Sequence, residues 1–363
     1  MKPGIPARLF MNGLRNRDSK IIVGRFIMKW PLLLILFCTA IEPGAQELEQ
    51  NTNSQFDDSE VKTYTPKNIL IQGEVQASQS VDLSRLSLRS VAIKELAREN
   101  DKQVFKGAYF VSGYSLYDVL NRIRIKKAPE NTFKPPVDLY VTVENDKGEK
   151  AVFSWGEIYY RNSFDILITK TVQPVNPARA KIVWPLPDEP RLICGNDLLN
   201  VRFINNPSKI TIRSFFESAG GEKPKDIYSP EITISSNSGS VAIRDIGAAV
   251  GKRKNEGVLY GHGMGFKEIF SGTGYLLKDV LSAHAAWTPE QLKSSFLAIS
   301  AKDGYRVVFS ASEVMNRSDN HDYLLNDLKD NTSGGRYTLI VTSDYFADRD
   351  VRSVEKITLV QIE

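Results

Sequence analysis

The side chains best suited to bind a ligand lie in one short stretch of the C-terminal half, "GHGMG", Gly261 to Gly265. Its three glycines allow a backbone to approach a ligand closely, because they carry no side chain. His262 and Met264 add an imidazole and a thioether, which are soft donors. The stretch therefore predicts a ligand-binding loop at His262 and Met264, and the alternative is a flexible turn that leads into a strand at Phe266.

The remaining polar residues give no pattern of a common catalytic or metal site. The acidic stretch "SDYFADRD", residues 343–350, lacks the alternating ligands and the sixth-position glycine of a calcium loop, so we expect a solvated turn. Serines such as Ser310 have no recognisable histidine and aspartate partners for nucleophilic catalysis. None of the histidines has a partner at the spacing of a zinc site; they are His262, His284 and His321.

The first 45 residues have the three parts of a secretory signal. Basic residues precede the apolar run "WPLLLILFCTAI", which is shorter than the roughly 20 residues that span a bilayer. We predict cleavage after Ala45 or Ala40, with Met28 as an alternative start and an uncleaved anchor as the alternative outcome. The mature protein is then periplasmic or secreted, and it meets a membrane only if the signal segment is retained.

The mature chain is expected to be an ordinary globular protein with little net charge. Residues 1–45 contain seven basic and two acidic residues, so their removal changes the net charge from +4 to −1. This excludes nucleic-acid binding based on overall charge. Cys194 is then the single cysteine, so no internal disulfide can form, and we interpret it as a small core residue. Residues 46–65 are polar and acidic, as expected of a flexible stalk.

The rest of the chain contains a sequence that occurs twice. "FKGAYFVSGYSLYDVL", residues 105–120, aligns without a gap over "FKEIFSGTGYLLKDVL", residues 266–281. Residues 140–158 align over 296–314 and residues 192–212 over 339–359, in the same order. Chance does not explain three ordered blocks, so we predict two tandem repeats. We call residues 66–213 repeat one and residues 229–363 repeat two, with residues 214–228 as a linker.

Each block predicts a piece of the same unit. The first block is a strand followed by a helix, with Leu116, Val119 and Leu120 on one helical face. The second is a hairpin, because a turn with Asp and Gly separates alternating apolar residues. The third is a pair of strands around a turn. There, Asp197 with Arg202 and Asp344 with Arg349 recur at the same spacing, which fits an ion pair across the turn.

The repeated unit resembles the molybdopterin-binding domain of the sulfite oxidase type, in two degenerate copies. The segments that carry the resemblance are "FSGTGYLLKDVL", "AKDGYRVVFSASEV" and "GGRYTLIVTSDYFADRDVRSVEKITL" of repeat two. The resemblance implies an α+β fold made of two tandem mixed-sheet domains. In that family a cysteine thiolate binds the molybdenum, and arginines of the closing segment contact the pterin and its phosphate. Carried over, these contacts are Arg349 and Arg352.

The chain departs from this family at the metal ligand. No cysteine lies upstream of the first block in either repeat, and Cys194 lies in a closing strand instead. We therefore expect no cofactor, and an exported, non-catalytic pseudoenzyme that binds a small molecule or an envelope protein. The alternative is a molybdopterin-dependent oxidoreductase that lacks the thiolate and holds its cofactor around His262, Met264, Arg349 and Arg352. A purely structural role in an envelope assembly is the third hypothesis.

Overall fold

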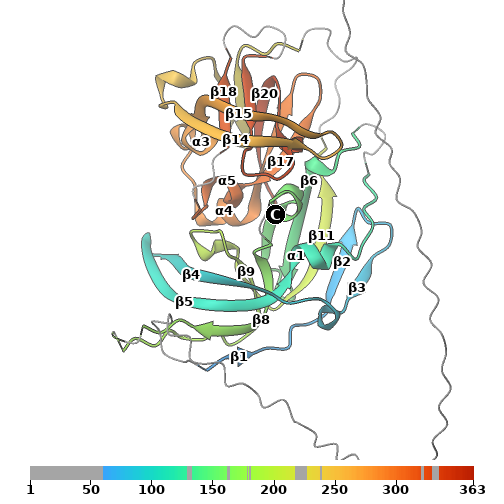
Figure 1. The fold of residues 1–363 in the computed structure, drawn as a ribbon, viewed down its shortest axis with the longest axis vertical. Coiled ribbons are helices and arrows are strands. Elements are labelled where there is room, and N and C mark those ends of the chain that lie inside the picture. Colours follow the sequence, from blue (N-terminus) through green and yellow to red (C-terminus); the bar gives the residue numbers. More distant parts are fainter. Residues whose placement is uncertain are drawn as a thin grey trace, which may run out of the picture. The chain divides into compact units, whose positions relative to one another are not determined.

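A computed structural model describes residues 60–363 except 129–132, 162–163, 178, 180, 217–226, 238, 320–322 and 329–334 (Figure 1). Residues 53–363 form one compact unit. The predicted signal segment, residues 1–45, lies outside the described residues, as does the predicted stalk up to residue 59. The predicted linker contains the gap 217–226, so its structure is described only at its ends.

The first half of this unit contains eleven strands among the described residues, up to the end of repeat one. They are β1 (Lys62–Thr63), β2 (Ile69–Gly73), β3 (Gln79–Val81), β4 (Arg89–Glu99), β5 (Lys102–Ser115), β6 (Leu139–Asn145), β7 (Lys150–Ser154), β8 (Ile166–Pro174), β9 (Arg191–Cys194), β10 (Ile204–Asn205) and β11 (Pro207–Ser214). Its helices are short. They are α1 (Leu116–Leu120), α2 (Trp155–Tyr159) and the 3-10 helices η1 (Leu83–Arg85), η2 (Pro136–Asp138) and η3 (Asn200–Arg202).

Repeat two has nearly the same order of elements. Its strands are β12 (Ile232–Ser236), β13 (Gly239–Ile243), β14 (Arg253–Gly261), β15 (Gly265–Leu276), β16 (Ser295–Ala301), β17 (Arg306–Ser310), β18 (Leu324–Asp327), β19 (Tyr337–Ile340) and β20 (Val354–Gln361). Its helices are α3 (Leu277–His284), α4 (Pro289–Ser294), α5 (Ala311–Met315), η4 (Ile246–Ala248) and η5 (Ala347–Arg349).

The described strands form four sheets, two from each half of the chain. In repeat one the orders are β10-β9-β8-β5-β4, with β1 beside β8, and β3-β2-β11-β6-β7. In repeat two they are β14-β15-β18-β19 and β13-β12-β20-β16-β17. In both halves the closing strand, β11 or β20, runs parallel to the first long strand, β2 or β12. The long hairpins β4–β5 and β14–β15 stand at corresponding places (Figure 1).

The predicted α+β fold class is wrong, because the fold is mostly β. Strands take 50% of the described residues and helices 16%, and the four small sheets form a ring like a four-bladed β-propeller. The longest described helix, α3, has eight residues. The apolar triplet Leu116, Val119 and Leu120 is buried as predicted, but it supports only the five residues of α1. The alternating residues before it instead extend into the 14-residue strand β5.

The core has one main cluster in each half and a smaller cluster between them. Repeat one packs Ile71, Val141 and Ile212 beneath α1, and repeat two packs Leu297, Ile299 and Ile357 beneath α3. Between the halves, the opposite faces of the β6–β7 and β16–β17 hairpins meet. Tyr140 stacks on Phe296 there, with ring centroids 4.6 Å apart. Each of these sheets is therefore apolar on both faces, which explains why strand β16 is buried throughout.

Candidate functional site

The predicted loop "GHGMG" is the tip of the long hairpin β14–β15. Gly265 adopts a positive φ of 74°, which a residue with a side chain rarely tolerates, so this glycine serves the turn. The Nδ1 atom of His262 lies 3.7 Å from a carboxylate oxygen of Asp348, and its ring lies 4.6 Å from that of Phe346. Met264 is 86% exposed. The two soft donors thus sit on a projecting tip.

Arg349 is fully buried in a network of ion pairs, and each of its three nitrogens donates to a neighbouring side chain. Its Nε and Nη2 donate to the Asp344 carboxylate at 2.6 and 2.7 Å. Its Nη1 donates to both oxygens of Glu313, at 3.1 and 3.0 Å, and to Ser154 Oγ at 3.1 Å. The predicted ion pair with Asp344 is present. The contact with Ser154 links the two repeats.

Arg202 makes the equivalent network, with the roles of the two repeats exchanged. It donates to Asp197 at 2.8 and 2.7 Å, to Glu157 at 2.9 and 3.0 Å, and to Ser310 Oγ at 3.1 Å. Ser310 is the N-cap of α5 in repeat two, and Ser154 is the N-cap of α2 in repeat one. Each arginine therefore binds the acids of its own repeat and the helix N-cap of the other one.

The two networks differ in their acid groups. Burial raises the pKa of Glu157 above its ordinary value, although Arg202 acts against it. Burial acts in the same direction on Glu313, but Arg349 and Arg161 outweigh it, so the pKa of Glu313 is lowered. Arg161 Nη2 lies 3.5 Å from Glu313 Oε2. The extra arginine makes the Glu313 network the better compensated of the two.

The four predicted contact residues do not form a molybdopterin site. Arg349 is buried, Arg352 is exposed at the edge of a separate hollow, and His262 and Met264 lie at the hairpin tip. Cys194 packs in the core of repeat one, and burial raises the pKa of its thiol well above the ordinary value, which disfavours the metal-binding thiolate. No three His, Cys, Asp or Glu residues in the described part of the chain could hold a metal ion together. The residues present do not fit that cofactor.

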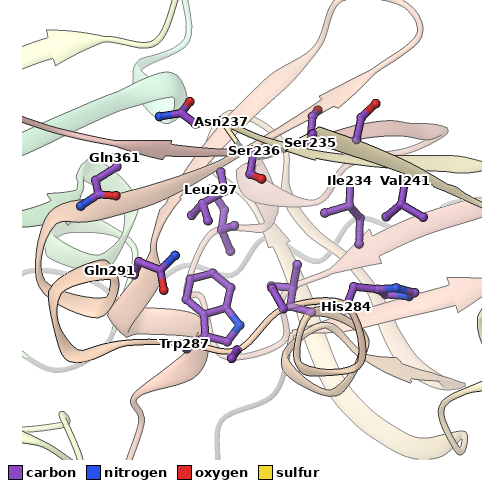
Figure 2. Close-up of a pocket in the computed structure, with 16 residues that line it drawn as sticks. Ile234, Ser235, Ser236, Asn237, Val241, His284, Trp287, Gln291, Leu297 and Gln361 are labelled. Atoms are coloured by element: carbon purple, nitrogen blue, oxygen red, sulfur yellow. The ribbon is translucent and has the colours of Figure 1, made fainter.

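A hollow of a size suited to a small molecule lies elsewhere in repeat two. It is a hollow of about 600 Å³, which we call the neutral hollow, beside the end of α3 (Figure 2). Trp287 forms one wall with Leu297, and Gln291 and Gln361 stand on one side (Figure 2). Ile234 and Val241 stand on the other side with His284, and Asn237 lies at the rim (Figure 2). Strands β12, β13 and β20 supply the sheet side of the hollow.

The neutral hollow is lined by a mixture of apolar and polar side chains. None of its described residues has a carboxylate, ammonium or guanidinium group. Gln291 is held in place because its Oε1 accepts a hydrogen bond from the Thr288 backbone, as part of the cap of α4. The indole Nε1 of Trp287 is buried without a hydrogen-bond partner among the described residues. Burying an N–H group in this way costs free energy unless another group accepts its hydrogen bond.

The corresponding place in repeat one is closed by the chain itself. Ile71 and Ile212, which correspond to Ile234 and Leu359 by their pairing register, are fully buried. The segment after α1 covers them, because Ile125 forms a β-bridge with Val75. Further bonds join this segment to the first strands, namely Gln79 Nε2 to Arg122 O, Gln76 N to Arg124 O and Lys126 N to Glu74 O. In repeat two Ile234 and Leu359 stay partly exposed on the hollow.

Sequence reasoning missed the neutral hollow, although one signal pointed to it. After the matched blocks, repeat one continues with "NRIRIKKAPE" and repeat two with "SAHAAWTPEQ". The second segment lacks the apolar pair Ile123 and Ile125 that covers the sheet in repeat one. It extends α3 to His284 and then places Trp287 at the opening. The sequence showed that the two segments differ, but it did not show that this difference leaves a hollow in repeat two.

Comparison of the sequence with models of protein families found no match, and comparison with curated proteins found none either. Among the residues described here, no helix has the length and apolarity needed to span a membrane. The function therefore has to be argued from the geometry of the site.

Proposed function

We propose that the chain is an exported, non-catalytic binding protein whose neutral hollow takes an uncharged organic molecule with an apolar face. The observation that carries this proposal is the open hollow of repeat two at a place that repeat one closes with its own chain. The alternative of a molybdopterin oxidoreductase has less support, because Arg349 is fully buried and each of its nitrogens already donates to an acidic residue or to Ser154.

The lining favours an uncharged ligand over a charged one. A charged group in the neutral hollow would lose hydration without finding a carboxylate, ammonium or guanidinium group among the described lining residues. The Trp287 ring and the aliphatic side chains of Ile234 and Leu297 favour an apolar surface on the ligand. The amides of Gln291 and Gln361 supply donors and acceptors that would orient hydroxyl groups. A glycoside with an alkyl chain has both features.

Binding of n-octyl β-glucoside, measured by titration calorimetry below its micelle concentration, tests this proposal. We expect saturable binding, and weaker or no binding of octyl sulfate, which has the same chain and a charged head. Val241→Arg places a long charged side chain at the mouth and should weaken binding at least tenfold. Trp287→Ala should do the same by removing the wall.

The matched control lies at the corresponding position of repeat one. Gln79 pairs with Ile71 as Val241 pairs with Ile234, so Gln79→Arg adds the same side chain beside the closed copy. We expect this variant to bind the glucoside as the unchanged protein does. Absence of saturable glucoside binding, or equal binding by the Val241→Arg and Trp287→Ala variants, would overturn the proposal.

A further inference from the structure

We infer that repeat two has a second site, a docking site for an extended, proline-containing segment of a partner protein that carries an aromatic and a basic residue. The site is the concave hollow, about 1070 Å³, between the hairpin β14–β15 and the segment around η5. The inference rests on repeat one, where the chain occupies the corresponding concave face with a segment of this kind.

In repeat one this internal segment is "VWPLP", residues 183–187. Its Trp184 and Leu186 pack against Tyr109 and Tyr64 on the concave face. The phenol groups of both tyrosines donate to backbone carbonyls of the segment, Tyr109 to Pro185 at 2.7 Å and Tyr64 to Pro187 at 2.5 Å. Trp184 also meets the edge of Phe105, with ring centroids 5.1 Å apart. A proline-containing segment thus covers the sheet by packing the alternate side chains Trp184 and Leu186 against it.

In repeat two no segment among the described residues covers the corresponding sheet in this way. The connection from β18 to β19 runs from residue 328 to 336, whereas the connection from β8 to β9 runs from 175 to 190 and contains the covering strand. The concave face keeps an apolar centre of Leu259, Phe270 and Ile340. Phe266, which aligns with Phe105, is 62% exposed. Its aromatic partner in repeat one, Trp184, has no counterpart among the described residues of repeat two.

Two positions of the concave face carry glycine in repeat two. By the register of the hairpins, Gly257 stands where repeat one has Ile93, and Gly272 stands where it has Val111. Both Ile93 and Val111 are buried against the internal segment. A Cβ atom at Gly272 would lie 2.3 Å from the Phe270 ring, so the ring lies over this glycine. A Cβ atom at Gly257 would likewise lie 2.8 Å from the Thr342 side chain, so in repeat two Phe270 and Thr342 take the space that Val111 and Ile93 fill in repeat one.

The charges around the concave hollow specify a basic residue on the partner segment. Its lining carries four carboxyl groups and two basic groups, which are Glu268, Asp303, Asp348, Asp350, Lys267 and Arg352. Above the pKa of Asp350, about 7, four carboxylates face two basic groups, and this excess attracts a positive group. The internal segment offers a model, because Lys181 precedes its apolar residues in "KIVWPLPD", residues 181–188.

A labelled peptide of the sequence KIVWPLPD tests the inference by fluorescence anisotropy with the full chain. We expect saturable binding that weakens at least fivefold with Phe266→Ser in the protein. The peptide with alanine in place of tryptophan should lose binding, and the peptide with glutamate in place of lysine should bind more weakly. The Phe105→Ser variant is the matched control in repeat one and should bind as the unchanged protein does.

Two results would overturn the inference. One is the absence of saturable peptide binding. The other is binding that responds to Phe105→Ser and not to Phe266→Ser, because the peptide would then be displacing the internal segment of repeat one. Since Phe266 is largely exposed, its replacement leaves the core intact, and an unchanged unfolding midpoint would confirm that the variant is folded.

Discussion

Repeat one and repeat two differ most in what covers their sheets. Repeat one closes its α1 side with Ile123 and Ile125 and its concave side with Trp184 and Leu186. Repeat two leaves both corresponding places open, as the neutral hollow and the concave hollow. Both copies keep the buried arginine network that holds them together. The comparison indicates that repeat one closes both places with its own chain, whereas the described residues of repeat two leave both open.

The largest effect is expected at the contacts that the two repeats share. Arg349→Met would leave Glu313 and Asp344 buried without their main positive partner, which should lower the unfolding free energy by about 3–5 kcal/mol. Arg202→Met should cost at least as much, because Arg161 remains beside Glu313 but makes no ion pair with Glu157. Urea unfolding of both variants measures this. A cost below about 1 kcal/mol for either would contradict a shared buried network.

A pH-dependent difference is expected at Asp350, since repeat one has Phe203 at the same place. Burial raises the pKa of Asp350 to about 7, and nearby Asp344 and Asp348 act in the same direction while Lys267 and the Val341 N–H oppose it. Between about pH 4 and 7 the folded chain keeps a proton that the unfolded chain releases, so the unfolding free energy falls as pH rises through this range.

Asp350→Asn should abolish the fall of the unfolding free energy with pH, and its amide oxygen can still accept the hydrogen bond from the Val341 N–H. The variant should match the unchanged protein near pH 4 and exceed it by at most about 4 kcal/mol at pH 8, since the pKa rises from 3.8 to about 7 and each unit corresponds to about 1.4 kcal/mol. Thermal unfolding across this pH range measures the difference. An unchanged slope in the variant would show that other groups cause the dependence, and Phe203→Leu serves as the matched change in repeat one.

A smaller effect separates the covered and the open concave faces. Trp184→Ala in repeat one should lower the unfolding free energy by about 2 kcal/mol, less than for a fully buried tryptophan, because Trp184 is only partly buried. Phe266→Ala at the open face should cost less than about 0.5 kcal/mol. Chemical unfolding of the two variants gives the comparison. Equal costs would mean that the face of repeat two is covered as well.

The smallest effects are expected at the hairpin tips. Met264→Ser should change the unfolding free energy by less than about 0.5 kcal/mol, because this side chain is 86% exposed. At the tip of repeat one, Asn100 has a φ of 47°, so Asn100→Ala should cost about 1 kcal/mol through backbone strain. Urea unfolding of the two variants, each compared with the unchanged protein, measures these costs. A larger cost at Met264 would indicate that the tip packs against something in solution.

The elements that depend on neighbours in sequence were predictable. The strand and helix of the first block, the Asp-Lys-Gly hairpin and the turn ion pairs of Asp197 and Asp344 are all present. The fold class was not, because helix starts such as "GYSLYDVL" give no measure of how soon the helix ends. The candidate site was not predictable either, because Trp287 borders a hollow only through the placement of β12, β13 and β20.

The sequence by itself determined that a unit occurs twice, which residues alternate in its strands, and where the copies diverge. The tertiary structure alone decided that Arg349 reaches Ser154, 195 positions away, and that one copy is covered while the other is open. The physical reason is that alternation and capping depend on residues a few positions apart. A buried ion network or an open hollow depends on which distant segments meet, and no local pattern records that.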